Sequence, residues 1–269
     1  MTASDSPAAP SAARDADLVQ VEHLTMCFGQ HLVQRDLDFT IRRNEVFVIM
    51  GGSGCGKSTL LRHLIGLQKP AAGLVRYGEQ DLNTSEGEVL AGLRRQFGVM
   101  FQAGALWSSM SVGDNVMLPL ELFTRKTAAE REQVARDKLA QVGLAESFDE
   151  APSALSGGMR KRAAIARAMA LEPPLLYLDE PSAGLDPLTS AHIDELILDL
   201  RRRLGTTVVM VTHELDSIFA VADRALFLDA DEKTMTALDS PQALAAHGPD
   251  KVRAFLRRRP RDLAAPGAA

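Results

Sequence analysis

Apolar and polar positions along the chain predict strands that alternate with helices. Leu18 to Thr25 alternates apolar and polar residues, as expected of a strand. Val46 to Met50 and Leu175 to Leu178 are continuous apolar runs, which are typical of strands buried on both faces of a sheet. Further strands are predicted at Leu37 to Ile41, Gly73 to Tyr77, Phe97 to Phe101, Thr206 to Thr212 and Ala225 to Asp229. This alternation indicates an α/β core with a mostly parallel sheet.

The segment 103–160 differs from the rest because it has no β-rich run, and we expect it to form a helical subdomain. Thr127 and Glu130 form a capping box there, at the start of a helix that ends near Val142. Elsewhere, Pro187 starts a helix that Gly205 ends. The other predicted helices run to about Leu67 after a glycine-rich loop, from the Ser-Gly-Gly at 156–158 to Leu171, from Glu214 to Val221, after Ser240-Pro241 and from Lys251 to Arg258.

Composition excludes several function classes. The 269 residues carry a net charge of -5, which gives no reason to expect a nucleic-acid partner. No run approaches the ~18 apolar residues of a membrane span, so any membrane role is that of a peripheral subunit. Residues 1–17 and 259–269 are predicted to be disordered tails around one domain, residues 18–258. Cys27 and Cys55 fit no zinc or redox pattern, which favours a reducing cytosol.

The glycine-rich loop after the strand Val46 to Met50 matches a phosphate-binding loop. Residues 51–58 fit G-x-x-x-x-G-K-[ST] between a strand and a helix, which is the context that this motif requires. Glycines let successive backbone N–H groups point at phosphate oxygens, and the helix N-terminus adds partial positive charge. Lys57 is predicted to meet the β- and γ-phosphates of ATP, and the Ser58 hydroxyl to bind Mg²⁺. The predicted ATP contacts in this loop are Gly51, Gly52, Ser53, Gly54, Cys55, Gly56, Lys57, Ser58 and Thr59.

Two carboxylates, Asp179 and Glu180, directly follow the strand Leu175 to Leu178. A carboxylate at this place is suited to hold Mg²⁺ through water, which is the predicted role of Asp179. Hydrolysis needs an attacking water in line with the γ-phosphate, and Glu180 is the candidate to polarise that water. Acidic residues at strand ends are more often solvated or cap a helix, so this prediction depends on the phosphate loop upstream.

A second candidate anion site lies at Leu155-Ser-Gly-Gly-Met159, where two glycines and a serine start a helix. A flexible N-cap turn is the alternative if the segment is taken alone. A protein with one phosphate loop does not need two anion sites. It can use both if two subunits pair head to tail and each presents Ser156 to the other's ATP.

The order of these motifs resembles that of ABC transporter ATPases, over about residues 18–256. The resemblance implies a RecA-like phosphate-loop core, a small antiparallel β subdomain and the helical subdomain, with ATP and Mg²⁺ held between two copies of the chain. It implies that Gln102 touches Mg²⁺ and couples to a membrane partner. It also implies that His213 contacts the γ-phosphate, although a structural histidine is the alternative.

The resemblance assigns further contacts. Phe28 lies where the family stacks an aromatic ring on adenine, although a Phe at a strand end is more often a core residue. The segment Ser182 to Asp186 resembles the loop that crosses the dimer. The contacts implied for the partner chain's ATP are Ser156, Gly157, Gly158, Met159 and Asp186.

Met159 departs from the commoner family pattern, which has Gln after Ser-Gly-Gly. Together with the segments 101–115, 156–162 and 252–256, it resembles ATPases of the Mla and mammalian-cell-entry (MCE) lipid transport systems. This implies phospholipid transport between bacterial membranes, powered from the cytoplasmic face of the inner membrane. The implied partners are permease subunits, an MCE-type lipid-binding protein and a small regulatory subunit.

Two alternatives stay open from the sequence. One is an ABC transporter for an amino acid, an ion or a drug. The other is a soluble ABC ATPase that acts on nucleic acid or assembles another complex. The second is disfavoured because the chain has neither a long heptad insertion nor a tandem second domain. For the surface between Gln102 and Leu155, Trp107 and Met110 are equally suited to a partner groove and to core packing.

Overall fold

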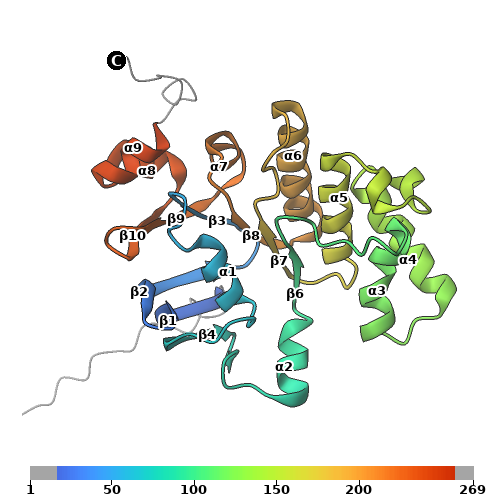
Figure 1. Cartoon of the computed structure of the whole chain (residues 1–269), viewed down its shortest axis with the longest axis horizontal. Coiled ribbons are helices and arrows are strands. Elements are labelled where there is room, and N and C mark those ends of the chain that lie inside the picture. The colour runs from blue at the N-terminus through green and yellow to red at the C-terminus, as the bar shows by residue number, and fades with distance from the viewer. Residues whose placement is uncertain (1–16, 258–269) are drawn as a thin grey trace, which may run out of the picture.

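The computed structural model describes residues 17–257, which form two sheets and the helices that cover them (Figure 1). The smaller sheet is antiparallel and has the order β2-β1-β4-β5, with β1 (Asp17–Phe28), β2 (His31–Arg42), β4 (Ala72–Tyr77) and β5 (Gln80–Asp81). The larger sheet has the order β10-β9-β3-β8-β7-β6, with β3 (Val46–Gly51), β6 (Phe97–Met100), β7 (Leu175–Asp179), β8 (Thr207–Val211), β9 (Arg224–Asp229) and β10 (Thr234–Asp239). Only its edge pair β9–β10 is antiparallel among the described strands.

Most of the helices lie around the two sheets, and a second group lies together at one end of the large sheet, on which one of its helices packs (Figure 1). The second group contains α3 (Val112–Phe123), α4 (Ala128–Gln141) and α5 (Gly157–Ala168), with no strand between Met100 and Leu175. The remaining helices are α1 (Lys57–Leu64), α2 (Gly87–Arg94), α6 (Pro187–Leu204), α7 (Leu215–Val221), α8 (Pro241–His247) and α9 (Asp250–Leu256). None of the helices within residues 17–257 has both the length and the apolar character needed to cross a membrane.

The large sheet is buried on both faces because successive side chains of a strand point to opposite sides. In β3, Val46, Val48 and Met50 enter a core with α5, α6 and α7, whereas Phe47 and Ile49 enter a second core with α1 and the small sheet. The strands β7 and β8 alternate between the same two cores. This double burial explains why the central strands read as continuous apolar runs.

The predicted architecture is confirmed, with an α/β core, an antiparallel sheet and a helical insertion. The helix Pro187–Leu204 has the predicted ends, and the capping box at Thr127 and Glu130 is present. Several predicted boundaries were wrong by a few residues. The strand β2 begins at His31 rather than at Leu37, and α1 ends at Leu64 rather than at Leu67. The strand β1 includes Asp17, and the predicted tails 1–16 and 259–269 lie outside the described residues.

Strand register brings the ends of three strands to one level. Val211 of β8 lies opposite Ile49 of β3 on one side and opposite Asp179 of β7 on the other. The segments that leave these strands are the glycine-rich loop, Glu180 and His213. They therefore meet at one edge of the sheet, which is where ligands bind in open parallel sheets.

Gly98 lets the end of α5 pack directly on the strand β6. A Cβ atom at position 98 would lie 2.0 Å from the carbonyl oxygen of Ala168 and 2.8 Å from a methyl carbon of Leu176. Neither the helix carbonyl nor the neighbouring strand can move without disturbing the core.

We therefore expect Gly98→Ala to lower the free energy of unfolding by about 1–3 kcal/mol through overpacking, measured by urea denaturation. Gly92→Ala is the control, because Gly92 lies within α2 and a Cβ there meets nothing within 4 Å. The control should raise the stability by roughly 0.5–1 kcal/mol, since alanine favours the helix. Equal stability of the two variants would contradict the close packing of β6 on α5.

Candidate functional site

The loop between β3 and α1 has a backbone shape that only glycine accommodates at two positions. Gly51 has a φ of 149° and a Cβ there would lie 2.5 Å from the carbonyl oxygen of Leu228. Gly56 has a φ of 100° and a Cβ there would lie 2.7 Å from Val33 Cγ1. Both positions combine a left-handed conformation with close neighbours, which glycine alone tolerates. The loop is thus built as the tight turn that the phosphate-binding motif predicts.

Buried polar contacts hold this loop in shape. The Lys57 ammonium donates hydrogen bonds to the carbonyl oxygens of Gly51 (3.0 Å) and Gly52 (3.1 Å). Gln34 is fully buried, and its side-chain amide donates to the carbonyl oxygens of Cys55 (2.7 Å) and Asp229 (2.9 Å). Gln34 therefore ties the loop to β2 and β9. The sequence prediction missed Gln34 because it started the strand at Leu37. With the strand extended to His31, Gln34 would have stood out as a polar residue at an inward-facing position.

Ser58 and Asp179 come together across the sheet edge. The Ser58 hydroxyl donates a hydrogen bond of 3.1 Å to the Asp179 carboxylate. Burial raises the pKa of Asp179, and the Ser58 hydroxyl partly offsets this. A hydroxyl and a carboxylate oxygen at this spacing are the ligand types that Mg²⁺ prefers, so the pair fits the predicted magnesium site.

Glu180 is held in a conformation that non-glycine residues rarely adopt. Its φ is 50°, and such left-handed geometry costs of order 1–3 kcal/mol unless its surroundings enforce it. One carboxylate oxygen accepts a hydrogen bond from His213 Nδ1 at 2.8 Å. The other, Oε2, is buried and has no hydrogen-bond partner among residues 17–257. An unpartnered buried carboxylate oxygen suits the predicted role of Glu180, which is to orient a water molecule.

The second predicted anion site also forms a compact unit, at the starts of α5 and α6. Ser156 caps α5 by accepting a hydrogen bond from the Met159 backbone N–H, and Asp186 caps α6. A Cβ at Gly158 would lie 2.5 Å from Thr189 Cγ2, so this glycine allows α5 and α6 to approach. Met159 is half-buried against the core beneath α5. Ser156 and Asp186 are both exposed.

Within the described part of the chain, no hydrogen bond joins residues 156–159 or Asp186 to the phosphate loop. The predicted site residues therefore fall into two separate groups. One group contains the phosphate loop, Asp179, Glu180 and His213, and the other contains Ser156 to Met159 with Asp186. Ser156 and Asp186 of the second group offer polar atoms at the surface.

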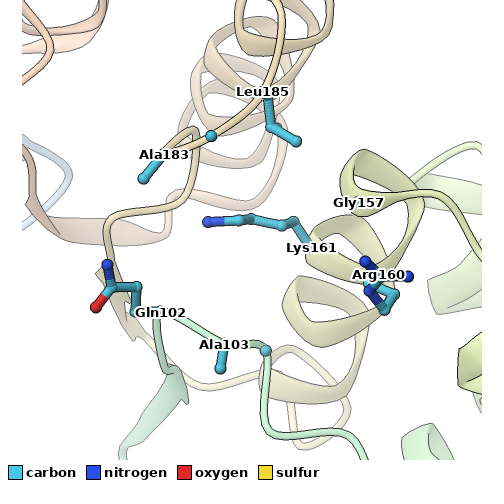
Figure 2. Close-up of a pocket in the computed structure, with 9 residues that line it drawn as sticks. Gln102, Ala103, Gly157, Arg160, Lys161, Ala183 and Leu185 are labelled. Carbon is cyan, nitrogen blue, oxygen red and sulfur yellow. The ribbon is translucent and has the colours of Figure 1, made fainter.

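Gln102 lies beside the second group, where it lines a cavity of about 240 Å³ (Figure 2). The other lining residues come from the loop after β6, from the start of α5 and from the loop before α6, namely Ala103, Gly104, Gly157, Arg160, Lys161, Ala183, Gly184 and Leu185. Figure 2 shows the Lys161 side chain reaching from α5 toward the loop that carries Ala183. Gln102 thus shares one cavity with Gly157 and Lys161 of α5.

Two aromatic residues, for which the sequence left core packing as an alternative to a binding role, are exposed. Phe28, at the end of β1, has 49% of its surface exposed, and Trp107 has 59%. Neither ring is a core residue, which removes the core-packing alternative for both. Stacking of Phe28 on adenine stays a prediction. Met110 is only half-buried, and Cys27 and Cys55 are both free.

Comparisons with known proteins agree with this arrangement. The family model for ABC transporters matches residues 34–183. The phospholipid transport ATP-binding protein MlaF of Escherichia coli K12 is 38% identical over 241 residues, which cover 90% of this chain and 89% of MlaF. The probable ribonucleotide transport ATP-binding protein mkl of Mycobacterium tuberculosis H37Rv is 40% identical over 205 residues. That match covers 76% of this chain but only 57% of mkl's length.

A solved structure with the same fold is the dimeric ATP-binding cassette MJ0796 in a post-hydrolysis state bound to ADP and Pi. Its TM-score is 0.75 at 30% sequence identity, and the match covers 82% of this chain and 98% of MJ0796.

The geometry around Glu180 leads to a test of its predicted role. Glu180→Gln keeps the shape of the side chain and removes the negative charge that would polarise water. We expect hydrolysis of ATP to fall by roughly 10²-fold or more while ATP binding is retained. Turnover and nucleotide affinity should be measured in parallel, and the variant should accumulate as an ATP-bound dimer on size exclusion. Normal turnover would move the role of the base to another residue.

Proposed function

The chain belongs to the ABC transporter family, and on that premise we propose that it binds and hydrolyses ATP as the motor subunit of a transporter. The observation that supports this most directly is the cluster at the ends of β3, β7 and β8. There the loop around Lys57, the Ser58–Asp179 pair and the Glu180–His213 pair meet at one sheet edge.

The proposed roles follow from the chemistry of each side chain. Lys57 and the loop N–H groups bind the β- and γ-phosphates, and Phe28 stacks on adenine. Ser58, Asp179 and Gln102 hold Mg²⁺, which supplies positive charge to the phosphate oxygens when bound. Glu180 accepts a proton from the attacking water, and His213 orients the Glu180 carboxylate and contacts the γ-phosphate.

We further propose that two copies of the chain pair head to tail. The two separate groups of site residues support this, because one nucleotide cannot contact both groups of the same chain if they remain apart as described. The dimeric cassette MJ0796 shows that the same fold pairs in this family. ATP between Lys57 of one chain and Ser156 of the other then stabilises the closed pair, and hydrolysis releases it.

The permease contact is proposed on the surface between Gln102 and Leu155. Three large apolar side chains are exposed there, namely Trp107 at 59%, Leu122 at 64% and Phe123 at 52%. Exposed apolar side chains of this size favour a protein partner. The chain would thus lie on the cytoplasmic face of the inner membrane, where it transmits the motion of the dimer to the permease.

The proposed cargo is a membrane phospholipid. The match to MlaF supports this because it extends over nearly the full length of both chains. A lipid transporter must extract its cargo within the membrane and take energy from outside it, and this chain supplies the energy. An MCE-type lipid-binding protein and a small regulatory subunit are the further partners that we propose. The match to mkl favours a second candidate cargo, a ribonucleotide, but covers only 57% of that relative.

The cargo is tested by purifying the complex through this subunit and extracting it for mass spectrometry. We expect a permease with enriched phospholipid. Deletion of the gene should alter lipid distribution or detergent sensitivity, and Lys57→Ala should fail to restore it whereas the wild-type chain should succeed. A permease of the amino-acid or metal type without enriched lipid would leave the ATPase proposal intact and overturn the lipid cargo.

A further inference from the structure

Lys161 makes a contact that the motifs do not assign. It lies in α5, one turn beyond the exposed cap Ser156, and its ammonium donates a hydrogen bond of 2.6 Å to the backbone carbonyl oxygen of Glu180. The side chain is half-buried and lines the cavity with Gln102 (Figure 2). A charged donor at this distance makes a strong hydrogen bond.

This contact bears on the strained residue of the site. The left-handed conformation of Glu180 is held from three sides. Its backbone N–H donates to the Val211 carbonyl oxygen at 2.8 Å, and its side chain accepts from His213. Its carbonyl oxygen accepts from Lys161 and, more weakly, from the backbone N–H of Ala183 at 3.3 Å. Strain of this kind persists only where the surroundings over-determine it.

We propose that Lys161 is a positioning residue for Glu180, which links the helix that contacts the partner's ATP to the carboxylate that acts on the chain's own ATP. The inference rests on the proposed function. The start of α5 presents Ser156 to the partner's nucleotide, and the same rigid helix carries Lys161. A shift of α5 therefore moves the Glu180 carbonyl. In this way, a change at the partner's ATP alters the position of Glu180 at the chain's own ATP.

The surroundings of Lys161 fit this role. Burial lowers the pKa of Lys161, and the nearby negative charges of Glu180, Glu214 and Asp179 oppose that effect. Arg160, the neighbouring cation in the same cavity, donates to the carbonyl oxygen of Leu155 at 2.6 Å instead. Among the basic side chains of the described residues, Lys161 is the one that donates to the Glu180 carbonyl.

The test compares Lys161→Met with Lys161→Arg in the assembled complex. The methionine keeps the side-chain length without a donor, and the arginine keeps a donor. We expect Lys161→Met to lower kcat for ATP hydrolysis by roughly 10- to 100-fold through misplacement of Glu180. Its KM for ATP should change by less than about twofold, because the phosphate loop is intact. Lys161→Arg should recover most of the loss.

Lys138→Met is the matched control, because the Lys138 ammonium in α4 also makes one short hydrogen bond, 2.8 Å to the Glu172 carboxylate after α5. It should lower the melting temperature without changing kcat. An equal loss of kcat in Lys161→Met and Lys138→Met would overturn the inference, and so would an unchanged kcat in Lys161→Met. Hydrolysis by the wild-type complex tests the proposed function separately. If Lys161→Met does not assemble, Lys161→Gln, whose uncharged donor is on a shorter side chain, takes its place, and a kcat equal to that of Lys161→Arg would overturn the inference.

Mixed dimers show in which chain Lys161 acts. A partner with Lys57→Ala leaves one working site, whose Glu180 comes from the other chain. Lys161→Met should lower turnover at that site by the same roughly 10- to 100-fold when it lies in the chain that supplies Glu180. It should have little effect when it lies in the Lys57→Ala chain, which supplies only Ser156 to that site. The opposite pattern would show that Lys161 acts through Ser156 and would overturn its link to Glu180.

Discussion

The site depends on the register of three parallel strands, β3, β8 and β7, which end at the same edge of the sheet. Val211 pairs with Ile49 on one side and with Asp179 on the other, so the chain leaves all three strands at the same edge. A one-residue slip of β7 would turn Asp179 to the opposite face and separate it from Ser58. The alternating burial of these strands in two cores prevents that slip. Packing of apolar side chains thus fixes the 3.1 Å distance between Ser58 and Asp179.

The same packing leaves the predicted site residues in two separate groups, which we propose are the two halves of one site. The phosphate loop and its carboxylates gather at the sheet edge, whereas Ser156 and Asp186 cap two helices beyond the cavity that Gln102 lines. In our proposal a second copy supplies the missing half. Binding energy from ATP then stabilises one arrangement of two rigid bodies, and its loss on hydrolysis favours another. The strained Glu180 is held by His213 and by Lys161 of α5. In our proposal, a movement of α5 in the dimer would therefore change the position of Glu180.

Much of the fold was predictable because local signals and the global fold agree. The apolar run Val46 to Met50, the capping box at Thr127 and the helix from Pro187 each need only neighbouring residues to be recognised. The strand β10 and the helix α2 were missed, because β10 has no fully buried residue and α2 buries only Leu93. The Gln34, Glu180–His213 and Lys161 contacts join residues 19 to 195 positions apart, so only the folded chain reveals them.

The head-to-tail pairing of the two half-sites is the central claim, and mixed dimers test it most directly. Chains with Ser156→Arg are combined with chains with Lys57→Ala, and ATP turnover is measured beside each homodimer. If Ser156 serves the partner's ATP, the mixed dimer has one site with both lesions and one intact site, and it should recover hydrolysis that both homodimers lack. Crosslinking of Ser156 to the partner's phosphate loop should accompany the recovery. A crosslink that forms only within one chain, without recovered turnover, would contradict the account.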